Sequence, residues 1–349
     1  NRPTVGEILQ AKGVSRRGFL KYCATTASLL ALPPSMIPRI AKAIESARRP
    51  SVIWLSFQEC TGCTESLTRS ASPTVEGLIF DAISLDYHHT LQAAAGEQAE
   101  AARHAAMEEN DGGYLVLVDG SIPMKNPGYS TIAGISNVDM LMDTVKGAAA
   151  VVAIGSCAAF GGLPGADPNP TGAVGVDELV KDKPVINVPG CPPIPTVMTA
   201  VLAQFLTFGT IPDLDKFGRP LAFFGNTIHD RCYRRPFYEQ GKFADTFDDE
   251  GAKAGWCLYK LGCKGPTTYN ACATVKWNQG TSFPIESGHP CLGCSEPKFW
   301  DKGGFYEPLS TGHFGSGAKL AGAAAAGVAL GVVSAAAGRR RQAKFTKEG

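Results

Sequence analysis

Apolar and polar positions follow one pattern from residue 51 to about residue 208 and then lose it. Within this stretch, short continuous apolar runs alternate with longer segments of helical periodicity. The short runs predict buried strands at 51–57, 79–85, 114–119, 149–155 and 184–188, and the longer segments predict helices at 90–109, 137–146, 174–181 and 195–208. Buried strands that alternate with helices are typical of an α/β protein with a doubly wound parallel sheet.

After Gly209 the pattern changes. Residues 217–308 hold few long apolar periods, many Gly, Pro and aromatic residues, and six cysteines. A region with so little regular structure needs another source of stability, and metal clusters supply one. We therefore predict a sheet domain at 44–216 and a smaller, irregular cluster-binding domain at 217–312.

The N-terminus is typical of a twin-arginine signal peptide. Arg16 and Arg17 stand before Phe-Leu-Lys, a weakly apolar stretch follows at 22–32, and Ala41-Lys-Ala43 forms a small-residue cleavage site. The alternative is a solvated basic pair. The signal-peptide interpretation predicts that residues 1–43, including Cys23, are removed and that the protein is exported to the periplasm.

The C-terminal tail at 313–349 contains an uncharged stretch at 320–337 that is followed by three arginines. Eighteen residues are just enough to span a bilayer, and the arginines would then lie on the cytoplasmic side. Because the stretch is mostly Ala and Gly, the alternative is a flexible or simple helical tail. The tail is thus a candidate membrane anchor.

Composition excludes two classes of protein. With 44% hydrophobic residues the chain is not disordered. Seven of its 33 Lys and Arg residues lie in the first 43 positions, so the remainder is slightly acidic. No nucleic-acid partner is expected for such a charge balance.

Ten of the eleven cysteines fall into three groups. In the first group, Cys60 and Cys63 follow the first predicted strand, whereas Cys157 and Cys191 follow the strands that end near residues 155 and 188. Because the carboxyl ends of parallel strands meet at one edge of a sheet, these four thiols are expected to lie together. Four thiolates are the usual ligands of a 4Fe-4S cluster. A Cys-x-x-Cys pair by itself also occurs in thioredoxin-like sites and zinc knuckles.

The second group consists of His229, Cys232, Cys257 and Cys263, and the third consists of Cys272, Cys291 and Cys294. The eleven ligands divide into four, four and three, which predicts two 4Fe-4S clusters and one 3Fe-4S cluster. Pro284 is the residue expected at the missing fourth position of the third group. Zinc is an alternative for the second group, because three thiolates and an imidazole also hold that metal.

Disulfides are the other alternative for these cysteines, since exported proteins are commonly disulfide-bonded. Two features oppose that alternative. Disulfide-dense folds are usually small, and the twin-arginine route characteristically carries proteins that are already folded around a cofactor.

Seven motifs resemble the small subunit of membrane-bound, periplasmic nickel-iron hydrogenases over nearly the whole chain. They are Glu59-Cys-Thr-Gly-Cys-Thr-Glu65, Gly155-Ser-Cys157, Val188-Pro-Gly-Cys-Pro-Pro193, Asp230-Arg-Cys-Tyr-Arg-Arg235, Leu261-Gly-Cys-Lys-Gly-Pro266, Tyr269-Asn-Ala-Cys272 and Gly288-His-Pro-Cys-Leu-Gly-Cys-Ser295.

The resemblance implies a flavodoxin-like first domain and a relay of three clusters. It implies a proximal 4Fe-4S cluster at the first group, a medial 3Fe-4S cluster at the third and a distal 4Fe-4S cluster at the second. It also places the catalytic nickel-iron site in a separate large subunit and implies a membrane cytochrome, such as a cytochrome b, as the acceptor. Two rival functions are an electron-transfer subunit related to the quinone-reducing complex I, which shares a single-cluster domain, and a non-redox exported protein.

Oxygen-tolerant relatives carry two extra cysteines around the proximal cluster, and the matching positions here are Gly62 and Gly162. This difference predicts a four-cysteine proximal cluster and an oxygen-sensitive enzyme. Glu59 and Glu65, which flank the Cys-x-x-Cys motif, are candidate proton-relay residues, with a structural role as the alternative.

Basic and aromatic residues surround the second and third cysteine groups. We expect the basic ones, with Tyr233, to steer an acidic electron acceptor or else to form an ordinary charged surface, and the large aromatic ones to shield the clusters. The first set is Arg231, Tyr233, Arg234, Arg235 and Lys264, and the second set is Trp256, Trp277, Phe283 and Trp300.

Overall fold

Five parallel strands form the central sheet, in the order β2-β1-β3-β7-β9. In chain order they are β1 (Ser51–Ser56), β2 (Ser84–His88), β3 (Tyr114–Asp119), β7 (Ala148–Ile154) and β9 (Val185–Val188). Each neighbouring pair in this sheet is parallel. This is the flavodoxin-like strand order, in which β2 is added on one side of β1 and the later strands are added on the other side, beginning with β3. The predicted fold class is confirmed.

The computed structural model describes residues 4, 6–7, 11, 13, 15–29, 33–46, 49–71, 73–303 and 305–309. Residues 1–307 form one compact unit. The candidate anchor at 320–337 lies outside the described residues. Within the described part of the chain, no helix is long and apolar enough to cross a membrane.

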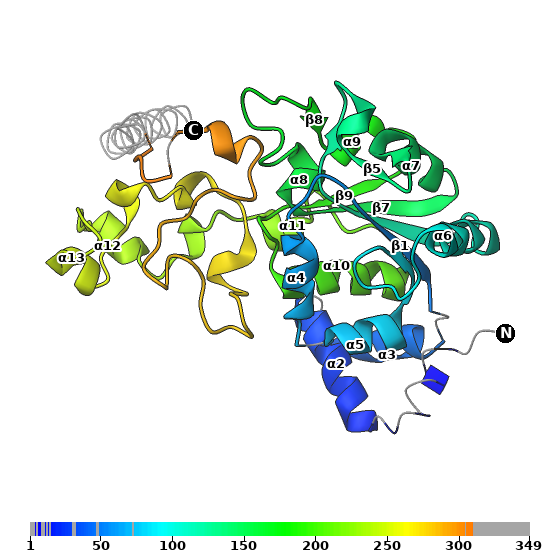
Figure 1. Ribbon diagram of the computed structural model, residues 1–349. Helices are drawn as coiled ribbons and strands as arrows, with labels where there is room; N and C mark the ends of the chain where they lie inside the picture. Colours follow the sequence, from blue (N-terminus) through cyan, green and yellow to red (C-terminus); the bar gives the residue numbers. More distant parts are fainter. Residues whose placement is uncertain are drawn as a thin grey trace, which may run out of the picture. The chain divides into compact units, whose positions relative to one another are not determined.

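Helices cover both faces of the sheet (Figure 1). On one face lie α6 (Glu97–Glu109), α7 (Asn137–Thr144), α8 (Gly155–Phe160) and α9 (Val176–Leu179), and on the other lie α4 (Gly62–Thr68) and α10 (Pro195–Phe208). Successive side chains of β1 point to opposite faces of the sheet, which explains these two layers. Ile53 and Leu55 pack in the core on the side of α6 to α9, whereas Val52 and Trp54 pack in the core on the side of α4 and α10. The remaining short elements of this region are α5 (Val75–Gly77), η2 (Leu78–Ala82), η3 (Pro127–Tyr129) and the strand pairs β4 (Ile122–Pro123) with β8 (Ala173–Val174) and β5 (Thr131–Ile132) with β6 (Ile135–Ser136).

Most predicted elements agree with the structure to within two residues, and α10 agrees at both ends. Proline at its first position has a backbone angle that suits a helix start, and Gly209 ends it in the left-handed conformation. The predicted helix at 90–109 begins only at Glu97, after Gly96 with φ +59°. The predicted helix at 174–181 shortens to α9.

The predicted strand at 79–85 is wrong over most of its length. Residues 78–82 form a π-helical turn, and β2 begins at Ser84. The side chain of Thr74 accepts a hydrogen bond from the Gly77 N–H and starts a helical segment just before these apolar residues. Leu78 reaches the core from this turn. The apolar run at 79–85 therefore belongs mostly to a buried helical turn instead of a strand.

The described part of the N-terminal region includes the helices α2 (Arg16–Leu29) and α3 (Ile37–Ser46) and the turn η1 (Pro34–Met36). They share a small apolar cluster that includes Phe19, Cys23 and Ile40. Arg16 and Arg17 begin α2. The proposed removal of residues 1–43 stays a prediction.

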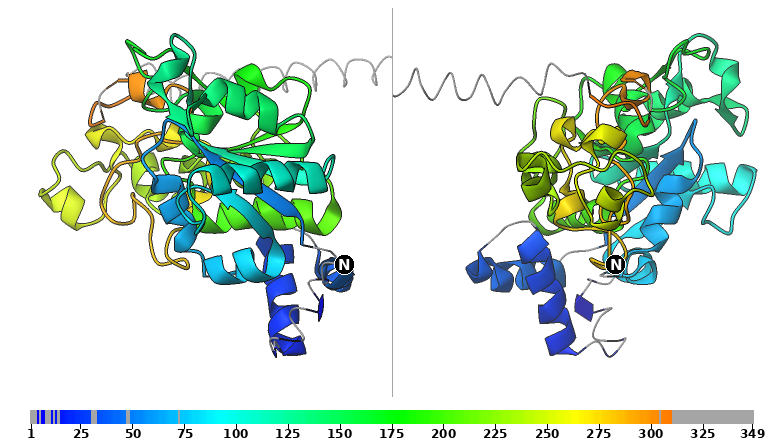
Figure 2. Two further views of the ribbon diagram at one scale, coloured as in Figure 1. Left: turned by 45° about the vertical axis from the view of Figure 1, so that its right-hand side comes forward. Right: turned by 90° about the vertical axis from the view of Figure 1, so that its left-hand side faces the viewer.

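Residues 217–307 are irregular, as their sequence predicts. They contain α11 (Leu221–Phe224), α12 (Arg235–Glu239), α13 (Glu250–Lys253) and the 3-10 turns η4 (His229–Arg231), η5 (Tyr259–Leu261), η6 (Gly265–Thr267), η7 (Ala271–Ala273) and η8 (Phe299–Asp301). Figure 2 shows this segment, from green-yellow to orange, on one side of the sheet. Its apolar residues continue the α10-side core. The boundary between 216 and 217 stays a prediction.

A buried histidine lies at the end of β2. The Thr90 N–H donates to His88 Nδ1 (3.2 Å), so Nε2 carries the proton of the neutral ring and faces the Thr64 hydroxyl (3.2 Å). Thr64 in turn donates to Asp119 (3.4 Å), which also accepts from the Trp54 indole (3.1 Å). Burial, with a smaller contribution from His89, lowers the pKa of His88 to about 4.

We expect this histidine to make the protein less stable in mild acid. Its folded-state pKa lies below the unfolded value, so the unfolded chain binds more protons as the pH falls from 6.5 towards 4. The loss amounts to about 2 kcal/mol between pH 7 and pH 5. Thermal unfolding of the assembled protein should therefore shift more over this range than that of the His88→Gln variant. Equal shifts in the two proteins would contradict the assignment.

Candidate functional site

The first cysteine group lies at the carboxyl edge of the sheet. Cys60 follows β1, Cys63 lies in the first turn of α4, Cys157 lies in α8 directly after β7, and Cys191 follows β9. Burial raises the pKa of Cys63 well above its usual value, and the next causes are Asp119 and the other three thiols. The fold thus brings together four cysteines that are up to 131 positions apart in the sequence.

Glycines leave space beside these thiols. Gly155 has φ +86°, and a Cβ added there would lie closer than 3.0 Å to Cys63 Sγ. Gly162 has φ +55°, and its Cβ would lie 2.6 Å from Cys157 Sγ. A Cβ on Gly62 would lie 3.1 Å from Cys60 Sγ. Such close approach of backbone to thiols suits a bound iron–sulfur cluster.

The second group lines one small cavity, which contains His229, Cys232, Cys257 and Cys263. The His229 ring packs edge-on against Tyr238, with 4.6 Å between ring centroids. Burial, followed by the charge of Arg235, lowers the pKa of His229. A neutral imidazole is the form that binds a metal. Three short segments, at 229–232, 257 and 263, therefore line this cavity with one nitrogen and three sulfur donors.

The third group lines a largely apolar cavity of about 150 Å³, which contains Cys272, Cys291 and Cys294. The Gly293 N–H donates to Cys291 Sγ at 3.4 Å, as backbone amides do to cluster sulfurs. Pro284 lines the same cavity and offers no ligand atom. Trp277 and Phe283 also line it, in agreement with a shielding role.

The three groups form a connected series. Cys191 of the first group lines the cavity of the third, and Cys294 is the largest cause, after burial, of the raised pKa of Cys191. Cys263 of the second group is likewise the largest cause, after burial, of the raised pKa of Cys291. The Lys264 N–H also donates to the Cys291 carbonyl (2.8 Å). The spatial order is therefore first, third and second group.

Burial raises the pKa of most of these thiols, for example of Cys157 to about 11 and of Cys257 to about 12. Without metal such thiols are protonated, and metal binding displaces the protons. Among the described residues, no three His, Cys, Asp or Glu side chains are grouped as ligands of one metal ion.

The two candidate relay carboxylates differ in their surroundings. Glu59 Oε2 is buried without a hydrogen-bond partner, and Thr61 donates to Oε1 at 3.3 Å. Burial, followed by Asp119, raises the pKa of Glu59 to about 7. Glu65 is 54% exposed and pairs with Arg69 at 2.7 Å. Glu65 therefore has a structural partner, whereas Glu59 Oε2 does not.

Two of the predicted surface cations are buried. Arg234 donates to the Trp256 carbonyl (2.7 Å), and Lys264 donates to the Glu307 carbonyl (2.5 Å). Their heads stabilise backbone instead of facing a partner, which corrects that part of the sequence interpretation. Arg231, Tyr233 and Arg235 are exposed.

Sequence reasoning missed Asp119, Ser156 and Arg219, which are buried beside the cysteine groups. Asp119 ends β3 at the edge that carries the first group, so its position was available from the strand pattern. Ser156 precedes Cys157 within one of the seven motifs. Nothing in the sequence separated Arg219 from a surface arginine.

Comparisons with known proteins agree with this geometry. Residues 224–307 match the family of the C-terminal part of the NiFe/NiFeSe hydrogenase small subunit, and residues 60–205 match the family "NADH ubiquinone oxidoreductase, 20 Kd subunit". The uptake hydrogenase small subunit of Azotobacter vinelandii is 52% identical over 309 residues, which cover 88% of this chain and 86% of that protein. The Hydrogenase-1 small chain of Escherichia coli K12 is 47% identical over 344 residues, covering 97% and 91%.

Solved structures of hydrogenases also resemble this chain. A chain of the reduced, active Ni-Fe-Se hydrogenase from Desulfomicrobium baculatum aligns with a TM-score of 0.70 and 35% identity, covering 75% of this chain and all of that one. The actinobacterial-type NiFe-hydrogenase from Ralstonia eutropha H16 aligns with a TM-score of 0.67 and 27% identity, covering 75% and 83%. On its sequence and its fold, this chain belongs to the family of NiFe hydrogenase small subunits.

Proposed function

We propose that this chain relays electrons through three iron–sulfur clusters in a NiFe uptake hydrogenase. The proximal 4Fe-4S cluster is held by Cys60, Cys63, Cys157 and Cys191, the medial 3Fe-4S cluster by Cys272, Cys291 and Cys294, and the distal 4Fe-4S cluster by His229, Cys232, Cys257 and Cys263. Bound clusters of these types would each accept and release one electron.

The connected series of the three groups is the observation that supports this proposal most strongly. Cys191 adjoins the medial cavity, and Cys263 adjoins Cys291. Apolar side chains surround the medial position, where Trp277, Phe283 and Ile285 line the cavity. A series of adjacent, shielded ligand sets suits electron transfer.

Catalysis belongs to a partner in this proposal. Hydrogen would be split to two protons and two electrons at the nickel-iron site of a large subunit, and a membrane cytochrome, for example a cytochrome b, would accept the electrons. The solved relatives are NiFeSe and NiFe hydrogenases. The twin-arginine motif supports a location at the periplasmic face of the membrane, with the C-terminal tail as the candidate anchor.

Metal analysis and EPR spectroscopy of the affinity-purified complex test this proposal. We expect about eleven cluster irons per chain, a co-purifying nickel-containing subunit, and a 3Fe-4S signal in the oxidised state that disappears under hydrogen. A preparation without iron would contradict the proposal and favour disulfides or zinc. Iron without nickel, and without reduction by hydrogen, would favour another redox complex.

The complex I-related alternative is supported by one observation, the family match over residues 60–205. That match ends before the segment that carries the second and third groups. Residues 224–307 match the hydrogenase family instead. The whole chain is therefore better explained as a hydrogenase subunit.

Glu59 is the better candidate of the two for a proton relay, because Oε2 is buried and has no partner. We expect Glu59→Gln to slow hydrogen oxidation by the assembled complex, since an amide does not accept and release a proton in this way. Glu65→Gln, which removes an exposed ion pair, should leave turnover unchanged. The hydrogen-dependent reduction rate of a dye, compared at equal iron content, is the measurement. Normal turnover of Glu59→Gln would indicate a structural role for both residues.

Oxygen sensitivity follows from the same proposal. Gly62 and Gly162 stand where oxygen-tolerant relatives carry cysteines, and both lie directly beside proximal thiols. We expect oxygen to inactivate the enzyme, and an assay of hydrogen oxidation in air tests this expectation.

A further inference from the structure

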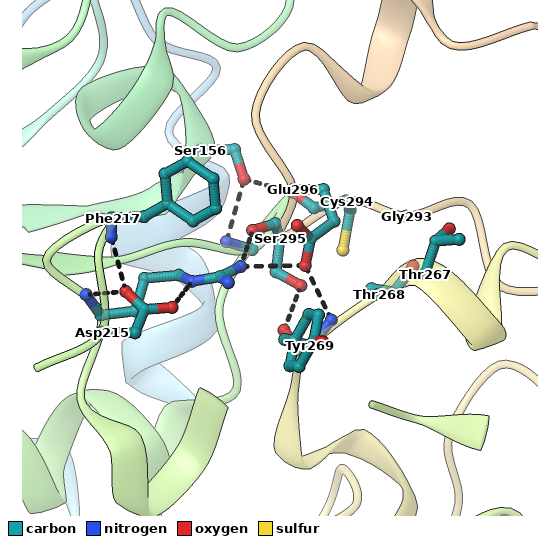
Figure 3. Close-up of polar contacts among 12 residues, drawn as sticks. Ser156, Asp215, Phe217, Thr267, Thr268, Tyr269, Gly293, Cys294, Ser295 and Glu296 are labelled. Carbon is teal, nitrogen blue, oxygen red and sulfur yellow. Dashed lines mark hydrogen bonds and ion pairs between the residues drawn. The ribbon is translucent and has the colours of Figure 1, made fainter. Parts of the chain in front are cut away.

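Two buried polar side chains join the sheet edge to the segment that carries Cys294 (Figure 3). The first is Ser156, which is 2% exposed and precedes Cys157. Its hydroxyl accepts a hydrogen bond from the Gly190 N–H (3.0 Å) and donates to the Cys294 carbonyl. Its own N–H donates to the Gly190 carbonyl (2.9 Å). One serine thus connects the backbone beside Cys157, Cys191 and Cys294.

The second is Arg219, which is also 2% exposed. Its Nε donates to Asp215 Oδ2 (2.8 Å), and its Nη1 donates to Glu296 Oε1 (2.9 Å) and to the Ser295 carbonyl (3.1 Å). The guanidinium also lies near three aromatic rings. Its central carbon is 5.1 Å from the centre of Phe217, 5.7 Å from that of Phe224 and 5.5 Å from that of Tyr269.

Both partners of Arg219 are themselves held in place. Asp215 Oδ1 accepts from the backbone N–H groups of Phe217 (2.8 Å) and Arg219 (2.9 Å). Glu296 Oε1 accepts from the Tyr269 N–H (2.7 Å), and the Ser295 hydroxyl donates to the Tyr269 carbonyl (2.8 Å). The network therefore links the end of the sheet domain to residues 294–296 and to the segment just before Cys272.

A role in stability alone does not account for this arrangement. A buried group of charges is often replaced by apolar residues without loss of stability, so its presence is weak support for a stabilising function. A guanidinium, in contrast, fixes its partners through several directed hydrogen bonds. The segment it fixes has no helix or strand of its own at 291–298 and supplies two ligands of the third group.

We propose that Arg219, together with Ser156, is a positioning residue for electron transfer, which holds the Cys294 segment at a fixed distance from the proximal cysteines. This inference rests on the proposed function, because it concerns the step in which the proximal cluster loses one electron and the medial cluster gains it. Hydrogen oxidation in the partner subunit supplies that electron.

The charge of Arg219 adds a second, separable effect. One cation here faces two carboxylates, Asp215 and Glu296, and Glu296 lies two residues from Cys294. Removing the cation leaves an excess of negative charge beside a medial ligand. Negative charge in a buried region opposes the addition of an electron. The medial reduction potential should then become more negative.

Four variants of the complete heterodimer separate these effects. Arg219→Met removes both the charge and the hydrogen bonds. Arg219→Lys keeps the charge but loses the planar guanidinium, which donates to several acceptors at once. Ser156→Ala removes only the hydroxyl. Lys146→Met is the control, since it deletes a 75% exposed cation that pairs with Asp143. Two quantities are measured by EPR. They are the midpoint potential of the 3Fe-4S signal and the rate at which hydrogen abolishes that signal in freeze-quenched samples.

Arg219→Met should show a more negative potential and a slower loss of signal than the unmodified protein. Arg219→Lys and Ser156→Ala should show an unchanged potential and a slower loss of signal, and Lys146→Met should change neither. Unmodified rates in Arg219→Lys and Ser156→Ala would overturn the proposal, and these two variants decide it if Arg219→Met does not assemble. Absence of a 3Fe-4S signal from the unmodified protein would overturn the cluster assignment instead.

Discussion

Replacing Gly155 by alanine should prevent binding of the proximal cluster. Gly155 has φ +86°, where a Cβ costs about 1–2 kcal/mol. That Cβ would also lie closer than 3.0 Å to Cys63 Sγ, which is far inside van der Waals contact. A thiol that must reach a cluster cannot turn away without losing its ligand position. We expect the purified complex to lose about four irons per chain and to lose hydrogen-dependent reduction of the other clusters.

Gly112→Ala is the matched control for this variant. Gly112 has a similar backbone angle, φ +75°, but a Cβ there meets no atom within 4 Å. It therefore carries the backbone strain without the steric overlap, and its iron content should equal that of the unmodified protein. If both variants bind a full complement of iron, Cys63 is not held beside Gly155 in the assembled protein.

The strand and helix pattern was predictable because the sheet is buried on both faces. The strand at 114–119 and the helix at 195–208 are continuous apolar segments with clear ends, and the structure has them with the same bounds. The segment at 79–85 has a similar apolar character but packs mostly as a helical turn. Its capping residue, Thr74, lies outside the apolar run and decides the outcome. Periodicity over a few residues does not contain that information.

The cysteine groups were predictable for a different reason. In a parallel sheet, the loop after each strand emerges at the same edge, so sequence order alone brings Cys60, Cys63, Cys157 and Cys191 to that edge. The second and third groups lie in irregular chain, where no such rule applies, and their grouping came from spacing and from the family resemblance.

The residues that connect the groups were not predictable. Arg219 differs from an exposed arginine only in its burial between Asp215, Glu296 and three aromatic rings. Burial of this kind results from tertiary packing of segments about 80 residues apart. For the same reason, Arg234 and Lys264 resemble surface charges in the sequence but bind backbone carbonyls in the structure.

Substitution of Cys257 by serine should remove one cluster and leave its neighbour intact. The neighbouring thiols that raise the pKa of Cys257 after burial are Cys263 and Cys232, both members of the second group. We expect loss of about four of about eleven irons, little reduction of an external acceptor by hydrogen, and an unchanged 3Fe-4S signal. If the second group instead bound zinc, the variant would lose zinc and keep its full iron content.

Cys263→Ser tests the spatial order of the groups in the same experiment. Cys263 adjoins Cys291 of the third group, and the two segments share the bond from the Lys264 N–H to the Cys291 carbonyl (2.8 Å). Its substitution should therefore remove the distal cluster and also alter the 3Fe-4S signal, which Cys257→Ser should not do. Cys23→Ser, at the one cysteine outside the three groups, should change neither iron content nor signal. If Cys257→Ser and Cys263→Ser gave identical spectra, Cys263 would not be the particular distal ligand that contacts the third group. That result would contradict the placement of the third group between the other two.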